Sequence, residues 1–536
     1  MKKHKSKKTS RREFIKYGSL AASSFFIVPR HVLGGEGYLS PSDKINIAGI
    51  GVGGKGTSDL WYASNEGKEN VVALCDVDMG DYTSKSRERF PKAKFYQDFR
   101  EMLDKEKNID AVTISSPDHM HAIQALAAMD LGIHVYVQKP LTHNIREARM
   151  LTERAREKRI VTQMGNQGAS NSGMVKVKEW FNAGLIGNVD EVFVWTNRPI
   201  WPQGIPVPKS DGSPVPEGFD WDLWLGTAPK IDYTDAYHPF NWRGWWAYGT
   251  GALGDMGCHI IDVPFRTLGL HYPVGVECSV GQVFIKKWNP EYIPEGCPPS
   301  SSVTLDFNST EKNNTNMKMR WLDGGLRPPH PDLIPASDPL GDESSSNGVM
   351  MIGSKGIITT GVYGFYPKLY RKGEETLKFD TSNQPGNEFG HQSKWIAACK
   401  SGFNSDEHKS LTSSFDYAGP MTETVLMGNI AIRSYMERKE GEKVQFPGRK
   451  KLLWDGDAMK ITNYEDANKY VTREYRKGWE DNLISYPELT SDEIKTSLLL
   501  EEYEFEYEWS FQTIIEEVTF VCKHKTTGTS IMAFAN

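Results

Sequence analysis

The chain has 536 residues, of which 38% are hydrophobic and 25% charged, and its formal net charge is −6. This length allows several domains, and the nearly balanced charge gives no whole-protein basic field for nucleic acid. After residue 34 no segment reaches the ~18 consecutive apolar residues that span a bilayer, so we expect no membrane span in the mature protein.

Residues 1–34 form a separate segment with a basic start, the pair Arg11-Arg12 and a short apolar run over 17–28. That run is too short to span a bilayer. The segment resembles a twin-arginine export signal; an amphipathic helix behind a basic arm is the alternative. Twin-arginine export carries folded proteins, commonly those that acquire a cofactor in the cytoplasm. We therefore expect a periplasmic protein with a tightly bound cofactor.

The strand-like run KINIAG (44–49) leads directly into a glycine-rich turn of the form G-x-G-x-x-G. Between a strand and a helix, such a turn lets the backbone approach a diphosphate closely, while the amides at the helix N-terminus face its charge. A glycine turn without a ligand is the alternative. We predict cofactor contacts from Gly51, Gly53, Gly54 and Gly56.

The next apolar run, NVVALCDVD (70–78), is typical of a strand buried on both faces, and Asp76 lies near its end. A carboxylate there accepts hydrogen bonds from the ribose diol of an adenosine and repels a 2′-phosphate. Because no arginine follows before Arg87, the sequence favours NAD over NADP.

Helical and strand-like segments continue to alternate through the strands predicted at 109–116 and 133–139. This order predicts one doubly wound parallel sheet, a Rossmann dinucleotide-binding domain over residues 43–165. Ligands of such sheets lie beyond the carboxyl ends of the strands. The further cofactor contacts predicted near these ends are Ser115, Ser116, Pro117, Gln138, Lys139 and Asn166.

Residues 166–479 contain several alternating apolar segments, which predict an α+β domain with a large, mainly antiparallel open sheet. We expect one face of this sheet to cover the cofactor and the other to support a homo-oligomer, a dimer or tetramer. Helices within 390–441 are expected to pack back on the Rossmann domain. The tryptophan-rich stretch 197–229 is either a set of sugar platforms or a packing loop. No function is assigned to the extension 480–536.

The six cysteines are scattered along the chain, with no C-x-x-C pair. This spacing predicts neither a disulfide framework nor a zinc site. The histidine and aspartate of RPPHPDLIP (327–335) also lack the ligand spacing of a metal site, so no metal is expected.

Four motifs in order carry a family resemblance: the glycine turn, SSPDHMH (115–121), QKPLTHNIREARML (138–151) and GALGDMGCHIID (251–262). Together they resemble the glucose-fructose oxidoreductase, inositol dehydrogenase and MocA family, written Gfo/Idh/MocA, over about residues 43–479. The signal-like segment is similar to that of a secreted branch. The resemblance implies a nicotinamide cofactor, a sugar or polyol hydroxyl as substrate, and a cofactor contact from His121.

The same resemblance assigns the residues around the reacting hydroxyl. The family's E-K-P lysine falls on Lys139, with Gln138 in place of the glutamate, and its helix motif falls on Asp255, Gly257, His259 and Asp262. Asp255 and His259 are four residues apart and therefore share one helical face. We assign the catalytic base to His259, alkoxide stabilisation to Lys139 and substrate orientation to Asp255. In the alternative, Asp255 caps a turn and His259 is a satisfied core histidine.

Three functions are compatible with these residues. The first is an exported NAD-dependent oxidoreductase acting on a secondary hydroxyl of a sugar or glycoside, with NAD tightly bound because the periplasm offers no free pool. The second is a glycoside hydrolase that works through transient oxidation at C3 and elimination. The third is a binding protein on an oxidoreductase fold.

Overall fold

The computed structural model describes residues 43–286, 288–344, 346–382 and 389–480, together with three strands further along the chain. The predicted export signal lies outside the described residues, as does most of the extension 480–536. The described residues up to Glu474 belong to one compact unit, and those from Tyr475 onward to a second. The second unit contains an antiparallel sheet of β17 (Tyr503–Tyr507), β18 (Val518–His524) and β19 (Ser530–Ala535).

The N-terminal part of the first unit is a six-stranded parallel sheet in the order β3-β2-β1-β4-β5-β6. Its strands are β1 (Asn46–Ile50), β2 (Asn70–Cys75), β3 (Lys94–Tyr96), β4 (Ala111–Ile114), β5 (His134–Val137) and β6 (Thr162–Met164). The connecting helices are α3 (Gly54–Ala63), α4 (Ser84–Arg89), α5 (Phe99–Lys105), α6 (His121–Asp130) and α7 (Ile145–Glu157). The predicted Rossmann sheet is confirmed.

The C-terminal part contains a ten-stranded sheet in the order β14-β13-β12-β11-β7-β10-β9-β8-β15-β16, in which only β7 and β10 pair in parallel. Its strands are β7 (Val189–Trp195), β8 (Gly275–Val280), β9 (Ser301–Phe307), β10 (Met317–Leu322), β11 (Gly348–Gly353), β12 (Gly356–Thr360), β13 (Lys368–Tyr370), β14 (Leu377–Lys378), β15 (Leu452–Asp455) and β16 (Lys460–Ile461). The mainly antiparallel sheet predicted for this domain is confirmed.

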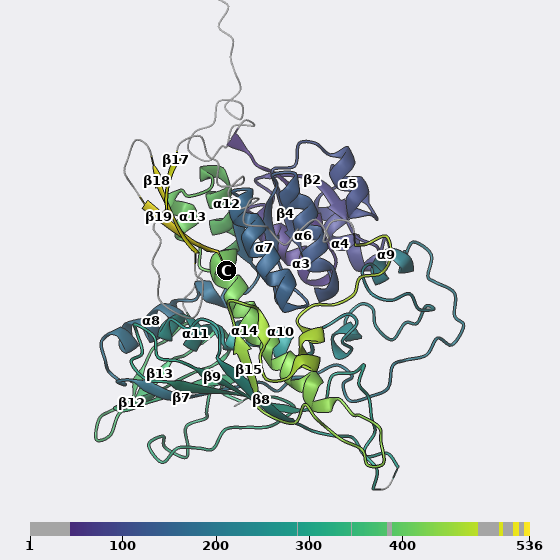
Figure 1. The fold of residues 1–536 in the computed structure, drawn as a ribbon. Coiled ribbons are helices and arrows are strands. Elements are labelled where there is room, and N and C mark those ends of the chain that lie inside the picture. The colour runs from purple at the N-terminus through teal and green to yellow at the C-terminus, as the bar shows by residue number, and fades with distance from the viewer. Residues whose placement is uncertain are drawn as a thin grey trace, which may run out of the picture. The chain divides into compact units, whose positions relative to one another are not determined.

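The helices that lie between the two sheets (Figure 1) are α8 (Ser172–Asn182), α10 (Gly251–Ile260), α11 (Asp262–Leu268) and α14 (Phe415–Met436). The helix α12 (His391–Ser401) packs on α3 and β5 of the Rossmann domain, and α13 (Asp406–Lys409) packs on α12. The long helix α14 contacts α7 of the Rossmann domain and β8 of the second sheet, and Arg149 of α7 pairs with its Glu423 at 2.9 Å. This contact fixes the domain junction at which α10 lies.

A cluster of buried aromatic side chains joins the two domains. It contains Phe219, Trp221, Trp224, Tyr237, Trp242, Trp245 and Tyr248, with Val77 of the Rossmann domain packed against it. The indole rings of Trp221 and Trp224 stack on each other at 4.8 Å, in the short helix α9 (Trp221–Leu225). These tryptophans are core residues, so the packing interpretation of this stretch describes their placement better than sugar platforms.

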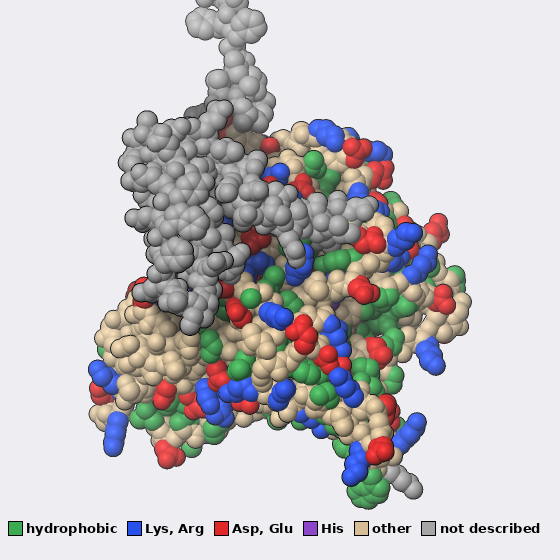
Figure 2. Space-filling model, viewed as in Figure 1, with side chains coloured by type: hydrophobic (Ala, Val, Ile, Leu, Met, Phe, Trp, Pro, Cys, Tyr) green, Lys and Arg blue, Asp and Glu red, His purple; other side chains and the backbone are tan. Residues whose placement is uncertain are grey.

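Within the described residues, no helix is long and apolar enough to cross a membrane. The same residues hold no cluster of histidine, cysteine and acidic side chains suited to a metal ion. On the face shown in Figure 2, basic and acidic side chains are interspersed.

Candidate active site

The glycine turn after β1 packs backbone against backbone. Gly51 has a φ of +72°, and a Cβ there would lie 2.6 Å from the amide nitrogen of Ser116. A Cβ at Gly56 would lie 1.7 Å from the carbonyl oxygen of Gly51. Side chains at these two positions would therefore push α3 away from the sheet, which explains why glycine is required.

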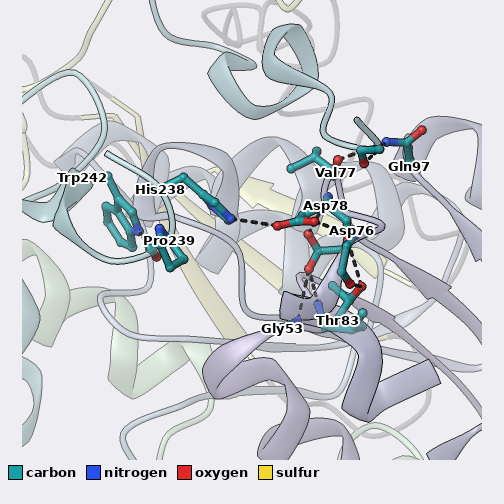
Figure 3. A network of polar contacts seen from close by, with 12 residues as sticks. Gly53, Asp76, Val77, Asp78, Thr83, Gln97, His238, Pro239 and Trp242 are labelled. Carbon is teal, nitrogen blue, oxygen red and sulfur yellow. Dashed lines mark hydrogen bonds and ion pairs between the residues drawn. The ribbon is translucent and has the colours of Figure 1, made fainter. Parts of the chain in front are cut away.

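Asp76 is the first residue after β2, and its carboxylate reaches the glycine turn (Figure 3). Oδ2 accepts hydrogen bonds from the backbone amides of Val52 at 2.8 Å and Gly53 at 3.1 Å. Burial raises the pKa of Asp76 to about 6, although these amides oppose the shift. The predicted ribose acceptor thus lies beside the turn. The strand ends at Cys75 rather than at 78 because the next residues pair with a segment of the other domain.

Tyr82, which the sequence did not single out, covers the outer face of the turn. A Cβ at Gly53 would lie 2.2 Å from its ring, and one at Gly54 would lie 2.3 Å from its hydroxyl. The ring is 38% exposed. A diphosphate that approaches Gly53 therefore requires the Tyr82 side chain to turn outward.

Lys139 and Asp255 come together from different domains. Lys139 follows β5, Asp255 lies in α10, and the distance from Nζ to Oδ1 is 2.7 Å. The Nε of Arg243 lies 3.2 Å from the same oxygen, and the arginine stacks on Trp242 at 4.2 Å. Burial alone would raise the pKa of Asp255, but Lys139 and then Arg243 outweigh it and hold that pKa far below its usual range. Asp255 is therefore a partly buried carboxylate shared by two cations.

His259 lies one helical turn beyond Asp255 and is 4% exposed. Its Nδ1 is buried and has no hydrogen-bond partner. Burial, reinforced by Lys139, lowers the pKa of His259 well below its ordinary value. Burial therefore favours the neutral form of the imidazole. A satisfied core histidine would have partners on both nitrogens, so the unpaired Nδ1 favours a role toward a ligand.

Asn166, like His259, has a buried polar atom without a hydrogen-bond partner. Its Nδ2 donates to Asp262 Oδ2 at 3.0 Å, while its buried Oδ1 has no partner. Asp262 also accepts from Arg266 at 2.9 Å and from the Tyr417 hydroxyl. Asp262 thus fixes Asn166, whose free oxygen is available to a polar ligand at the junction of the two domains.

Gln138, which replaces the family glutamate, donates from Nε2 to Asp59 Oδ2 at 2.8 Å. Asp59 is a fully buried carboxylate on α3 that the sequence analysis missed, and it also accepts from Ser115 at 2.9 Å and pairs with Lys55 at 3.0 Å. The sequence signal that could have identified Asp59 is its position four residues after Lys55 on the predicted helix. A glutamate at 138 would face Asp59 with a second negative charge, whereas the amide of Gln138 donates to it.

His121 joins two strand ends. Its Nδ1 lies 2.9 Å from the carbonyl oxygen of Pro140 and its Nε2 lies 2.8 Å from that of Ser116. The nearby Ser116 hydroxyl donates to Gln124 at 2.6 Å. The structure therefore places His121 as a residue that positions the ends of β4 and β5 rather than pointing a free nitrogen at a ligand. The predicted contact Pro117 lies in the same loop, directly before the short helix Asp118–Met120.

The fold and the site define a two-domain Rossmann protein with polar groups gathered where the domains meet. Residues 45–166 match the model of an oxidoreductase family with an NAD-binding Rossmann fold, and residues 189–282 match that family's C-terminal alpha/beta domain. Over these two segments the chain matches both parts of the Gfo/Idh/MocA oxidoreductase family, as the motifs predicted.

Similar proteins include enzymes of carbohydrate chemistry. Levoglucosan dehydrogenase of Pseudarthrobacter phenanthrenivorans is 25% identical over 233 residues, which are 43% of this chain and 49% of that protein. A glycosyl hydrolase family 109 protein of Shewanella pealeana is 27% identical over 170 residues, covering 28% of this chain and 37% of its own length. The chain thus matches less than half the length of each of these relatives.

Among solved structures, levoglucosan dehydrogenase in complex with NADH and levoglucosan aligns with a TM-score of 0.50 at 15% identity. The alignment covers 74% of this chain and 98% of that structure. At this identity the likeness supports the two-domain fold.

Proposed function

We propose that this protein is an exported NAD-dependent oxidoreductase that acts on a secondary hydroxyl of a sugar or glycoside. The observation that carries the proposal is the convergence of Lys139, Asp255 and the unpaired Nδ1 of His259 at the domain junction. The neighbouring glycine turn and Asp76 belong to a domain that binds NAD in this family.

The residues of the turn fit the cofactor. The amides at the start of α3 would bind its diphosphate, Asp76 would accept hydrogen bonds from a ribose, and the buried Oδ1 of Asn166 supplies a further acceptor. NAD supplies a nicotinamide that accepts a hydride from the carbon bearing the hydroxyl. Repulsion between Asp76 and a 2′-phosphate supports the preference for NAD over NADP.

Side chains of the protein accept the hydroxyl proton and stabilise the charge that its removal leaves on the oxygen. Neutral His259 accepts that proton at Nδ1, because this nitrogen is buried and unpaired. The Lys139 ammonium stabilises the negative charge that develops on the oxygen, and Asp255 holds the ammonium in place at 2.7 Å. Arg243 shares Asp255 and limits the movement of its carboxylate.

A glycoside hydrolase is the second candidate, supported by the likeness to the family 109 protein. Both activities begin with the same oxidation, but hydrolysis continues with elimination, water addition and re-reduction and leaves no net redox change. The deciding experiment adds a panel of sugars and aryl glycosides to NAD-loaded protein. A lasting rise in near-ultraviolet absorbance of the nicotinamide supports the dehydrogenase, whereas aryl-glycoside cleavage without that rise supports the hydrolase.

Export, cofactor retention and assembly complete the proposal. The paired Arg11 and Arg12 support periplasmic export in the folded state. Retention of NAD follows from the absence of a free periplasmic pool.

The second sheet alternates buried and accessible side chains along β9 and β10, so it offers a polar open face for a homodimer or tetramer. Light scattering on the mature protein tests the assembly, and an unchanged location of an R11K/R12K variant would contradict twin-arginine export.

A further inference from the structure

A segment of the C-terminal domain reaches across to the carboxyl end of β2. We call residues 216–240 the strap. Its backbone pairs with the residues that follow Asp76: the amide of Met79 donates to the carbonyl of Gly218 at 2.9 Å, and the amide of Asp220 donates to that of Val77 at 2.9 Å. The strap is therefore attached to the Rossmann domain by a short stretch of antiparallel pairing.

Side chains reinforce this attachment. The Nε2 of Gln97, just beyond β3, donates to the carbonyls of Val77 at 3.1 Å and Gly218 at 3.0 Å. The Nε2 of His238 lies 3.1 Å from Asp78 Oδ2 (Figure 3). These contacts connect the strap to the ends of two adjacent strands of the Rossmann sheet.

Three aromatic rings gather at this point. Phe219 stacks on the imidazole of His238 at 4.8 Å, and Tyr82 meets the same imidazole edge-on at 5.1 Å. Tyr82 is also the ring that covers Gly53. The aromatic group therefore extends from the glycine turn, past Asp76 and Asp78, to the strap.

The position of these aromatic rings at the end of β2 indicates which part of a bound dinucleotide they would contact. In a doubly wound sheet the adenosine half of a dinucleotide lies on the side of the second strand, next to the carboxylate that follows it. Here that side is bordered by Asp76, Asp78 and the strap. Aromatic faces suit an adenine base, since they stack on its ring and exclude water.

We propose that the strap forms the second wall of the adenosine subsite, with Phe219 and His238 bordering the adenine end of NAD. The inference rests on the proposed NAD-dependent function and adds a physical basis for cofactor retention. Release of NAD then requires the strap to separate from the end of β2, with loss of the Asp78–His238 contact and the backbone pairing. Dissociation is slow because these contacts must break together.

The test measures how fast NADH leaves the mature protein. The protein is loaded with NADH, mixed with excess NAD, and followed by the fluorescence of the bound reduced cofactor. We expect His238→Ala and Phe219→Leu each to accelerate dissociation at least tenfold. The matched control is His330→Ala, because His330 is an exposed histidine outside the strap, and its rate should equal that of the wild type.

Thermal unfolding of each variant shows whether it is folded, and Asp78→Asn, which weakens the same contact from the Rossmann side, replaces His238→Ala if that variant does not fold. Wild-type dissociation rates in all folded strap variants would overturn the inference while leaving the NAD-dependent function intact. Failure of the wild-type protein to bind NADH at all would instead contradict the proposed function.

Discussion

The ammonium of Lys139 and the carboxylate of Asp255 lie 2.7 Å apart although they come from separate domains and are remote in the sequence. Lys139 follows a strand of the cofactor-binding sheet, and Asp255 lies on the helix that also carries His259. The ion pair therefore links the Rossmann domain to the helix that carries the residue assigned as the base. Mutations of these groups separate cofactor binding from chemistry.

Replacing Lys139 by methionine should reduce kcat by about 10²–10³, because charge on the reacting oxygen loses its stabilising cation. NAD binding should change far less than kcat, since only one predicted cofactor contact is lost while the glycine turn and Asp76 are untouched. Steady-state kinetics with NAD titrations measure both quantities. The matched control is Lys105→Met, which removes an exposed lysine that pairs with Glu101 at the surface. Wild-type kcat in Lys139→Met would remove this lysine from the reaction.

Replacing His259 by asparagine should lower kcat by about 10²–10⁴, the usual contribution of a general base. Because burial and Lys139 hold the pKa of His259 well below its ordinary value, the imidazole stays neutral down to mildly acidic pH. The kcat of NAD-saturated wild-type enzyme should therefore show no loss of activity centred near pH 6.5. An inflection there that disappears in His259→Asn would show that the histidine titrates normally.

NAD affinity should fall as the pH drops through about 6, the raised pKa of Asp76. Above this pH the carboxylate is ionised and accepts hydrogen bonds from the ribose, whereas below it a proton competes with the cofactor. Asp78 and Tyr82 also face Asp76; the backbone amide of Asp78 lowers the pKa of Asp76, and its negative charge raises that pKa by less. Isothermal titration between pH 5 and 8 measures the change. An Asp76→Asn variant should bind NAD more weakly, and its NAD affinity should not change near pH 6. If the affinity of this variant still changes near pH 6, another group is responsible for the pH dependence.

Gln138→Glu should destabilise the protein by about 1–3 kcal/mol in its free energy of unfolding, because it places a second buried acceptor against Asp59 where a donor stood. Urea unfolding gives the value. The double variant Gln138→Glu/Asp59→Asn restores a donor and acceptor pair and should recover part of the loss. Equal stability of Gln138→Glu and the wild type would show that the Gln138–Asp59 contact contributes little.

Tyr82→Ala should accelerate NAD association, because the ring no longer covers Gly53 and Gly54. Stopped-flow quenching of tryptophan fluorescence measures the association rate. Tyr366→Ala is the control, since Tyr366 is also about half exposed but lies in the C-terminal domain. Association of Tyr82→Ala at the wild-type rate would show that the ring does not obstruct entry.

The sequence predicted the residues whose role follows from local pattern. The glycine turn and Asp76 were identified because strand, turn and carboxylate recur at fixed spacing in dinucleotide sites. The roles of Asp255 and His259 came from the family resemblance, and their shared helical face from spacing. The contact of Arg243 with Asp255 could not be predicted, because nothing near Arg243 in the sequence indicates that its guanidinium reaches this carboxylate.

Contacts between distant segments could not be predicted. The pairing of His238 with Asp78 depends on how the strap folds back across the domain boundary. Tyr82 covers the glycine turn because the loop after β2 folds back over that turn. The residues near Tyr82 show no sequence pattern that predicts this loop conformation. The tryptophans of 197–229 were ambiguous since aromatic residues serve equally in cores and in sugar sites; only burial separated the two.

Hydride transfer assisted by His259 can be measured by rapid mixing of NAD-loaded protein with its sugar or glycoside substrate, with near-ultraviolet absorbance reporting the bound nicotinamide. We predict that the absorbance rises in the wild-type protein and rises at least about 100-fold more slowly in His259→Asn at equal NAD content. No absorbance change in fully loaded wild-type protein with any sugar or glycoside, or equal rates in the two proteins, would contradict hydride transfer assisted by His259 at this site.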